Sequence, residues 1–396
     1  MKKLWSVNPP FKGGKEPPPP GAVLPAVRSF FARFDPFQVI PLILLVSTGL
    51  LFIYGTGRQI GFGTEHIWKR QLIYLGIGAA IWLFLTFFDY RWLGPAATVI
   101  YPIAIAFLVL VLFIGVKRNE ATRWLSFGGI TFQPSEFAKL AVLLTVSWIL
   151  SFQKADINKI LWAVLVFLTT SLPFFLIYLE PDLGTALVLF PAVAAIAFAA
   201  NLKFRYIIIL LVALLAVAPA VYMNLKPYQK ERIKTFLDPE RDPMDRGWNA
   251  LQAELTVGSG GLTGKGFMNG THCMLGYLPQ TVANSDFIFS VISEETGFLG
   301  TFSLLLLYAC LLFSIFRTAL LAPDPFGRYF CVGTGTILTV HVTVNMGMCL
   351  RLLPITGVPL PLISSGGTFL IVMMTYLGVV QSVYAHRHQE SFLEEV

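Results

Sequence analysis

The longest polar interval of the chain reads KPYQKERIKTFLDPERDPMDRGWNALQAELTVGSGGLTGKGFMNGTHCMLGYLPQTVANSD and runs from Lys226 to Asp286. On both sides of it lie apolar segments long enough to cross a bilayer, since a transmembrane helix needs about 20 mainly apolar residues. A chain that places so much apolar sequence in lipid and keeps one charged loop outside it is expected to do its chemistry at that loop. We therefore predict one large loop, residues 225–286, outside the membrane.

The composition of the whole chain points to the same class of protein. Of its 396 residues 55% are hydrophobic and only 13% are charged, whereas a soluble chain carries roughly a quarter of charged residues. The apolar segments are apolar all round, unlike the alternating strands of a membrane barrel, so they are expected to be helices that satisfy their own backbone polar groups.

The sequence thus predicts an all-α, polytopic membrane protein of about ten transmembrane helices. The ten candidate spans are Pro36–Tyr54, Trp68–Phe88, Trp92–Gly115, Ser135–Phe152, Ile160–Leu179, Leu183–Ala200, Phe204–Met223, Phe287–Phe316, Gly327–Cys349 and Ser365–Ala385.

The ends of the chain and the short loops predict its domains and topology. Residues 1–33 are basic and rich in proline, which is typical of a disordered tail. Residues 34–386 form the transmembrane domain and 387–396 a short C-terminal tail. Short loops on the N-terminal side carry about twice as many Lys and Arg residues as those on the opposite side, which favours both termini in the cytoplasm. This distribution explains the high pI of about 9.2 without nucleic acid as a partner.

Two short motifs place ionisable residues at the ends of spans. Glu136 and Lys139 lie one helical turn apart at the start of the fourth span, either as a structural ion pair or as part of a functional site. Asp182 follows Glu180 in a tight turn between the fifth and sixth spans, where helix capping and catalysis explain it equally well.

The large loop contains three further features. Trp248, Leu251 and Leu255 recur at helical spacing and predict a short helix on the membrane surface. The Gly-rich run 258–266 does not fit the phosphate-binding P-loop pattern, and its glycines suit a tight turn that approaches a ligand closely; Lys265 could still meet a lipid-linked pyrophosphate. Asp286 precedes an apolar helix, as a helix cap or as a general base.

The order of several motifs resembles the SEDS family of bacterial cell-wall polymerases. The stretches that carry the resemblance are Gln133-Pro134-Ser135-Glu136-Phe137-Ala138-Lys139, Glu180-Pro181-Asp182-Leu183-Gly184-Thr185, Arg232-Ile233-Lys234-Thr235-Phe236-Leu237-Asp238-Pro239, Gly258 to Gly266, Asn269-Gly270-Thr271, Asp286-Phe287-Ile288-Phe289, Glu294-Glu295, Asn345-Met346-Gly347, Leu353 to Pro361 and Ser365-Gly366-Gly367.

The resemblance implies a peptidoglycan glycosyltransferase that polymerises lipid II outside the membrane. The family's essential Asp falls on Asp286, and its motif Glu and Lys fall on Glu136 and Lys139. We further expect Arg123, Lys265 and Arg232 to bind substrate. Asp182, Glu295 and Ser365 are expected to support the site. No metal ligand is assigned, although a divalent cation is possible.

The expected partners are lipid II, membrane lipid and a class B penicillin-binding protein that acts as transpeptidase. The last of these follows from the resemblance, because the chain has no Ser-x-x-Lys motif of its own. Two other classes of function stay open at this point: a lipid II flippase or other transporter, and a scaffold without catalytic activity that positions a transpeptidase. Arg351 is unusual, since a small residue is common there in the family.

Overall fold

The computed structural model describes residues 33–60, 66–118, 121–127, 130–180, 182–206, 246–278 and 282–388, with short stretches between 208 and 238. Predictions for Arg232, most of the N-terminal tail, residues 389–396 and most of the span 204–223 therefore lie outside the described residues. Among the described residues the secondary structure is almost entirely helical, as predicted.

Nine of the ten predicted spans coincide with described helices. Seven of these helices are long and apolar enough to cross a membrane. They are α2 (Pro36–Ile60), α3 (Ile67–Phe87), α4 (Leu93–Ile114) with a preceding 3-10 turn η1 (Tyr90–Trp92), α6 (Ile160–Leu179), α13 (Ile288–Leu321), α14 (Pro325–Cys349) and α15 (Gly367–Ala385).

The other two predicted spans are helical but less simple. The fourth is α5 (Pro134–Ser151), which carries Glu136 and Lys139 in its first turns. The sixth is divided into α7 (Leu183–Leu187) and α8 (Leu189–Ala199). The break has a local cause, because Pro191 has no N–H to donate to Leu187 and its ring clashes with the carbonyl of that residue.

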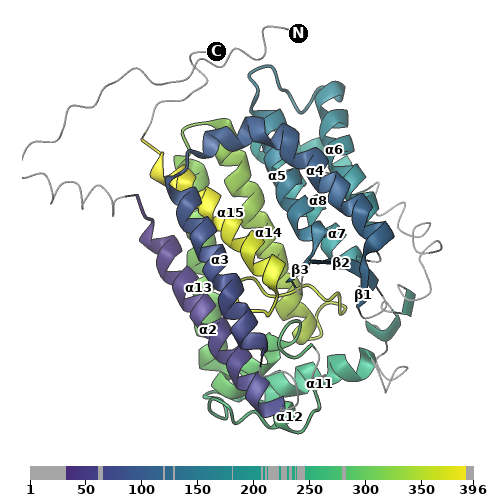
Figure 1. Cartoon of the computed structure of the whole chain (residues 1–396), viewed down its shortest axis with the longest axis vertical. Coiled ribbons are helices and arrows are strands. Elements are labelled where there is room, and N and C mark those ends of the chain that lie inside the picture. The colour runs from purple at the N-terminus through teal and green to yellow at the C-terminus, as the bar shows by residue number, and fades with distance from the viewer. Residues whose placement is uncertain are drawn as a thin grey trace, which may run out of the picture.

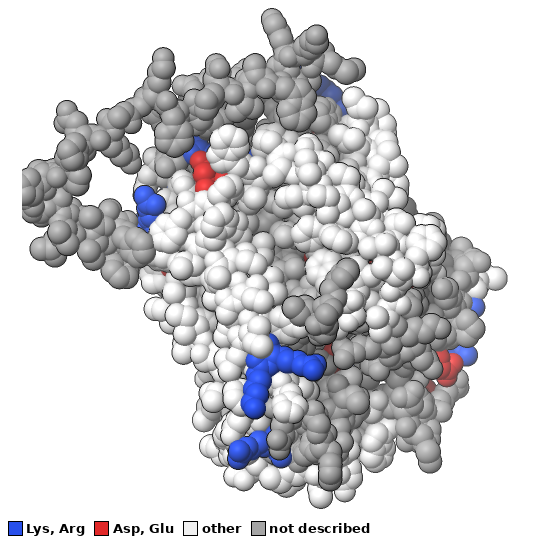
Figure 2. All heavy atoms as spheres, viewed as in Figure 1, with Lys and Arg blue, Asp and Glu red and all other residues white. Residues whose placement is uncertain are grey.

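The helices form one bundle in which α14 and α15 are central (Figure 1). In the most apolar stretch of α15, 78% of residues are buried, whereas the value is 22% for α3 and α4, so the latter turn broad apolar faces outward. Figure 2 shows a wide, almost uncharged middle on one face of the molecule, with Lys, Arg, Asp and Glu toward its ends. A lipid-facing band between two polar ends is the arrangement expected of a multi-pass membrane protein.

A small sheet, which the sequence analysis did not predict, connects α4 to α5. It consists of β1 (Val116–Arg118), β2 (Ala121–Phe127) and β3 (Ile130–Phe132), paired antiparallel in that order. Leu125 pairs with Phe132 in register and is fully buried. Thr368 at the start of α15 joins the sheet to the bundle, since its Oγ1 donates to the Thr131 carbonyl at 3.1 Å and accepts from the Gln133 amide at 3.2 Å.

The described part of the large loop includes the helices α11 (Arg246–Ser259) and α12 (Thr271–Met274). The short helix predicted there is confirmed as α11, and its position on the membrane surface stays a prediction. Trp248, Leu251 and Leu255 are exposed on it, whereas Ala250 and Ala253 are buried on its other face. Small residues on that face allow α11 to lie close against α13.

The Gly-rich run after α11 crosses a break in α13. At Gly297 the backbone of α13 leaves helical geometry (φ 65°, ψ −164°). The amides of Lys265 and Gly266 donate to the carbonyls of Glu294 and Glu295, both at 3.0 Å. In the opposite direction, the amides of residues 298 and 299 donate to the carbonyls of residues 261 and 262, at 2.8 and 3.1 Å. The loop therefore satisfies backbone groups that the break would otherwise leave unpaired.

These reciprocal hydrogen bonds between the loop and α13 require glycine at position 264. Its φ is +77°, and a Cβ there would lie 2.2 Å from the Glu295 carbonyl oxygen. The glycine thus permits a close approach to the backbone of α13, whereas the predicted approach to a ligand stays a prediction.

We expect Gly264→Ala to lower the free energy of unfolding by more than about 2 kcal/mol, because strained backbone costs about 1–3 kcal/mol and the clash adds to it. The melting temperature of the purified protein measures the change. Gly258→Ala is the matched control: its Cβ would meet nothing within 4 Å, and in helix α11 alanine should be neutral or slightly stabilising. Equal melting temperatures for the two variants would contradict the requirement for glycine at position 264.

Candidate functional site

A buried ion pair lies at the start of α5. The Lys139 Nζ is 2.9 Å from Glu136 Oε2, and the side chains are 0% and 2% exposed. A third group completes the arrangement, since Lys139 Nζ lies 3.1 Å from His341 Nε2 on α14. A lysine ammonium can only donate, so Nε2 accepts and the imidazole proton resides on Nδ1. Glu136 and Lys139 therefore form the ion pair that their spacing predicted, and the pair is buried.

His341 connects that pair to a loop of the site. Its Nδ1–H donates to the Pro359 carbonyl at 3.2 Å. Pro359 belongs to the segment Pro354–Pro361, here called the 354–361 loop, which follows α14. One turn further along α14, Asn345 Nδ2 donates to the Val358 carbonyl of the same loop at 2.9 Å. Two polar side chains on one face of α14 thus hold the loop in place.

Asp286 is attached to the same loop. Asn345 Nδ2 also donates to the Asp286 backbone carbonyl at 3.0 Å. The Asp286 carboxylate oxygen Oδ2 lies 3.4 Å from the position that a Cβ on Gly357 would occupy, and Gly357 has φ +73°. Asp286 is half-buried, and the assigned N-cap residue of α13 is its neighbour Phe287. The two predicted roles of Asp286, helix cap and general base, both stay predictions.

The residues before Asp286 are held from the other side by the segment just before α15. Ser364 Oγ donates to the Ser285 carbonyl at 2.6 Å, and the Ser365 amide donates to the Asn284 carbonyl at 2.9 Å. The predicted supporting residue Ser365 thus contacts the turn of Asp286 through its backbone. Its neighbour Ser364 contributes the side chain.

Arg123 and Asp182 lie together where β2 meets the turn between α6 and α7. Arg123 Nη1 is 3.6 Å from Asp182 Oδ1, and its Nε donates to the Glu180 carbonyl at 3.2 Å. Asp182 also caps α7, because its Oδ1 accepts from the Thr185 amide at 3.3 Å. Gly184 in the same helix packs against Thr356 of the 354–361 loop. This corner therefore contacts the loop that faces Asp286.

Glu180 is buried beside Asp182 in the same corner. Its side chain is 0% exposed, and neither carboxylate oxygen has a hydrogen-bond partner among the described residues. Burial, assisted by the negative charge of Asp182, raises the pKa of Glu180 to about 9. Glu180 is accordingly a neutral acid near pH 7.

Lys265 and Glu295 lie in a second polar cluster, at the break in α13. One oxygen of Glu294 is within hydrogen-bond distance of Lys265 Nζ at 2.6 Å and His272 Nδ1 at 2.8 Å. The His272 amide and the Thr271 hydroxyl both donate to it at 3.1 Å. Glu295 Oε2 accepts from the Met268 amide at 2.9 Å. Here the predicted substrate ligand Lys265 is the counter-ion of Glu294.

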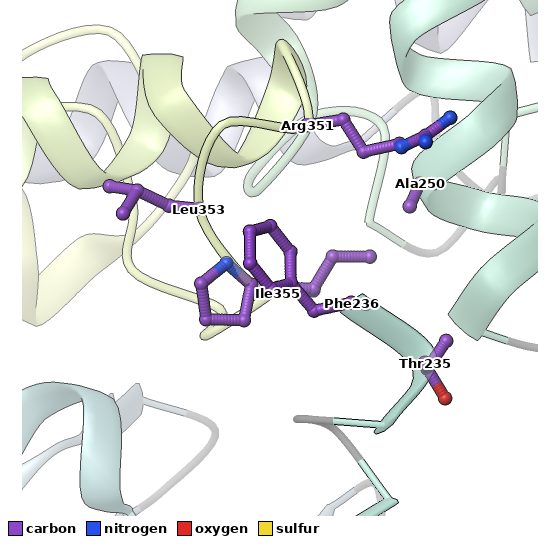
Figure 3. Close-up of a pocket in the computed structure, with 7 residues that line it drawn as sticks. Thr235, Phe236, Ala250, Arg351, Leu353 and Ile355 are labelled. Carbon is purple, nitrogen blue, oxygen red and sulfur yellow. The ribbon is translucent and has the colours of Figure 1, made fainter. Parts of the chain in front are cut away.

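A small hollow opens beside the 354–361 loop (Figure 3). Its lining residues are Thr235, Phe236, Ala250, Arg351, Leu353, Pro354 and Ile355. Arg351 extends toward α11 and donates to Glu254 Oε2 at 2.9 Å. Its φ of +58° belongs to the left-handed region, which disfavours side chains larger than glycine.

The structure therefore sorts the predicted site residues into two groups. Glu136, Lys139, Arg123, Asp182, Ser365 and Asp286 surround the 354–361 loop, whereas Lys265 and Glu295 lie at the break in α13. Arg232 lies outside the described residues. No three His, Cys, Asp or Glu side chains in the described part of the chain are placed to hold a metal ion.

Two residues that join the first group were not assigned from sequence. His341 and Asn345 are fully buried and link Lys139, the 354–361 loop and Asp286. The available signal was their four-residue spacing within an apolar span, where polar residues are costly and usually functional.

The fold and this site define a class: a multi-pass helical membrane protein with a cluster of ionisable residues at one end of its bundle. The chain belongs to the FtsW/RodA/SpoVE family, described as "Cell cycle protein", which it matches over residues 36–389. The predicted resemblance to the SEDS family is thereby confirmed.

Named relatives and solved structures cover nearly the whole chain. The peptidoglycan glycosyltransferase MrdB of Escherichia coli K12 is 36% identical, over 92% of this chain and 97% of its own. Stage V sporulation protein E of Bacillus subtilis is 33% identical, over 88% and 96%. A structure described as a peptidoglycan synthase complex that coordinates polymerization and crosslinking matches with TM-score 0.78, 34% identity and coverage of 90% and 99%. The crystal structure of rod shape determining protein RodA of Thermus thermophilus matches with TM-score 0.68, 30% identity and coverage of 90% and 98%.

We expect Lys139→Met to destabilise the protein by about 3–5 kcal/mol, because it leaves Glu136 as an uncompensated buried charge. Adding Glu136→Gln should restore most of the loss, since both charges are then absent. Thermal unfolding of the single and double variants measures both effects. A double variant no more stable than Lys139→Met would contradict a coupled pair.

Glu180 gives a prediction about pH. The folded state holds its proton up to about pH 9, whereas the ordinary glutamate value is 4.5. The folded protein therefore binds this proton more tightly than the unfolded chain, and stability from this group falls as pH rises from about 4.5 to about 9. Glu180→Gln imitates the neutral form, so its stability advantage over wild type should grow between pH 5 and pH 9.

Melting temperatures across that range test this expectation. Glu254→Gln, at the exposed carboxylate paired with Arg351, is the control, and its difference from wild type should stay about constant. If the melting-temperature difference between Glu180→Gln and wild type does not change with pH, the conclusion that Glu180 is a buried neutral acid is contradicted.

Proposed function

We propose that this chain is a peptidoglycan glycosyltransferase that polymerises lipid II into glycan strands at the outer surface of the bacterial cytoplasmic membrane, during elongation and shape maintenance. The observation that carries the proposal is the position of Asp286. It is half-buried, its backbone is fixed by Asn345, and its carboxylate faces the turn at Gly357. A carboxylate held at the edge of an apolar bundle is suited to act as a general base.

In this reaction the 4-hydroxyl of the acceptor sugar attacks the anomeric carbon of the donor. A new C–O bond forms, the C–O bond to undecaprenyl pyrophosphate breaks, and the hydroxyl proton passes to the Asp286 carboxylate. The 354–361 loop lies beside that carboxylate at Gly357, and the Glu136–Lys139–His341 group supports the loop from within the bundle. Positioning of this kind accounts for much of the barrier reduction in two-substrate reactions.

The relatives support this activity by their names. Escherichia coli MrdB is named a peptidoglycan glycosyltransferase, and the chain aligns with nearly all of it. A flippase would call for ionisable residues that lead through the bundle. In the described residues the buried Lys139 is instead held by Glu136 and His341 at the end of the bundle where Asp286 lies.

The same proposal includes orientation and partner. We place both termini in the cytoplasm, because the short loops on their side carry the excess of Lys and Arg. A reporter fused after Gln389 should then report a cytoplasmic position, and a periplasmic signal would contradict this topology. A class B penicillin-binding protein is the proposed partner. Support comes from the similar solved structure, which belongs to a complex described as coordinating polymerization and crosslinking, and co-purification tests it.

The central test is Asp286→Asn. We expect the purified variant to fold normally and to make about a hundred- to ten-thousand-fold less glycan from labelled lipid II, the usual loss with a general base. Asp156→Asn is the matched control, because Asp156 caps a turn at the other end of α5, and it should polymerise normally. Near-normal polymer from Asp286→Asn would exclude it as the base and direct attention to Asp182, Asp238 and Glu295.

A further inference from the structure

Among the described residues, the cations assigned to substrate binding are already paired with carboxylates. Lys139 pairs with Glu136 at 2.9 Å, Lys265 with Glu294 at 2.6 Å, and Arg123 with Asp182 at 3.6 Å. A pyrophosphate needs positive charge that is free to meet it. Each of these three cations would have to break its ion pair before it could fully neutralise a phosphate group.

A different set of cations lies at the ends of α2 and α3. Arg58 is in the last turn of α2, and Lys69 and Arg70 are in the first turn of α3. All three are exposed. Within the residues that the structure describes, none of them forms a salt bridge. We call Arg58, Lys69 and Arg70 the α2–α3 basic cluster.

Aromatic rings support two of these cations. The Arg58 guanidinium carbon lies 5.4 Å from the centre of the Tyr54 ring, and Lys69 Nζ lies 5.8 Å from that of Trp68. The two rings pack edge to face, 5.6 Å apart. Tyr and Trp at a helix end are typical of the membrane–water interface. Lys69 and Arg70 also oppose the helix dipole at the start of α3, so local stability does not explain their presence there.

The cluster lies at the end of the bundle where Asp286 lies. Gln71, next to Arg70, accepts from the Gly366 amide at 3.2 Å and donates to the Ser364 carbonyl at 3.4 Å. The Ser364 hydroxyl in turn donates to the Ser285 carbonyl, one residue before Asp286. Near Arg58, Phe52 packs against Phe267 of the large loop, with ring centres 5.6 Å apart.

Apolar, outward-facing surface continues from the cluster along both helices. Leu51 on α2 is 56% exposed and Ile73 on α3 is 63% exposed. In Figure 2 one group of Lys and Arg side chains lies toward the lower end of this face, over the region where α2 and α3 run in Figure 1, with uncharged surface above it. A ligand with an anionic head and a long apolar tail matches both parts of this surface.

We propose that the α2–α3 basic cluster is the entry subsite for the pyrophosphate of the lipid-linked donor, whose isoprenoid tail stays against the apolar faces of α2 and α3. This inference rests on the proposed function, because it names where that substrate is first held. The cluster binds the head group before transfer, so it acts on donor affinity and not on the chemical step.

The test is binding without turnover, with full-length protein carrying Asp286→Asn in nanodiscs of neutral phosphatidylcholine. Undecaprenyl pyrophosphate is the probe, and neutral undecaprenol and phosphatidylglycerol are compared with it. In the triple variant Arg58→Gln, Lys69→Gln and Arg70→Gln, we expect the Kd for undecaprenyl pyrophosphate to rise about 100-fold, at about fivefold for each interfacial charge. Undecaprenol binding should not change.

The matched control is Lys203→Gln with Arg205→Gln. These two bases follow α8 at the opposite end of the bundle from Asp182, both are exposed, and Arg205 lies 4.9 Å from the Tyr206 ring in a similar aromatic setting. The control should retain wild-type affinity for undecaprenyl pyrophosphate. Salt should weaken binding to the parent protein far more than to the triple variant. With Asp286 restored, the triple variant should raise KM for lipid II and leave kcat nearly unchanged.

Several results would overturn the subsite. One is an unchanged affinity of the triple variant for undecaprenyl pyrophosphate. A second is a loss of phosphatidylglycerol binding as large as that of the pyrophosphate lipid, which would make the cluster a general anionic-lipid surface. A third is a fall in kcat with unchanged KM. If wild type makes no glycan and the cluster nevertheless selects the pyrophosphate lipid, the subsite stands and the proposed polymerase function falls.

Discussion

The ion pair between Lys139 and Glu136 is the interaction on which the arrangement of the site depends. Two charges removed from water lose several kcal/mol of solvation each, and their attraction offsets this only with good geometry and further hydrogen bonds. His341 supplies the further partner for Lys139. Because one imidazole nitrogen serves the lysine, the other must donate elsewhere, and it donates to Pro359. The requirement to satisfy one buried ammonium thus extends to the loop that faces Asp286.

A second constraint is the backbone of α13. An interrupted helix near lipid leaves amides and carbonyls that water cannot reach, and each unsatisfied group is costly. The Gly-rich run satisfies them by reciprocal hydrogen bonds around Gly297. This makes the large loop part of the bundle and not a free appendage. The helix that begins just after Asp286 is therefore fixed at both its start and its break.

Much of this could be predicted from sequence, because the physics of apolar spans is local. Their length and composition predicted helices that the structure confirms, apart from residues 204–223, which lie largely outside the described part. The spacing of Glu136 and Lys139 predicted a pair, and the turn at Asp182 predicted a cap. What could not be predicted depends on tertiary neighbours: the partner of Lys265, the role of Asn345 and the burial of Glu180 all come from residues far away in the chain.

Cations inside the site and cations at its rim are satisfied in different ways. Inside the site each described cation that the sequence singled out has a carboxylate partner, since an unpaired buried charge would be too costly. Cations exposed at the boundary with lipid carry no such requirement, because water solvates them whether or not an anion is bound. A site of this kind can hold its own geometry with paired charges and leave unpaired charges at the rim to attract an anionic substrate. Rigidity of the interior and affinity for a charged lipid are then provided by different residues, so that neither weakens the other.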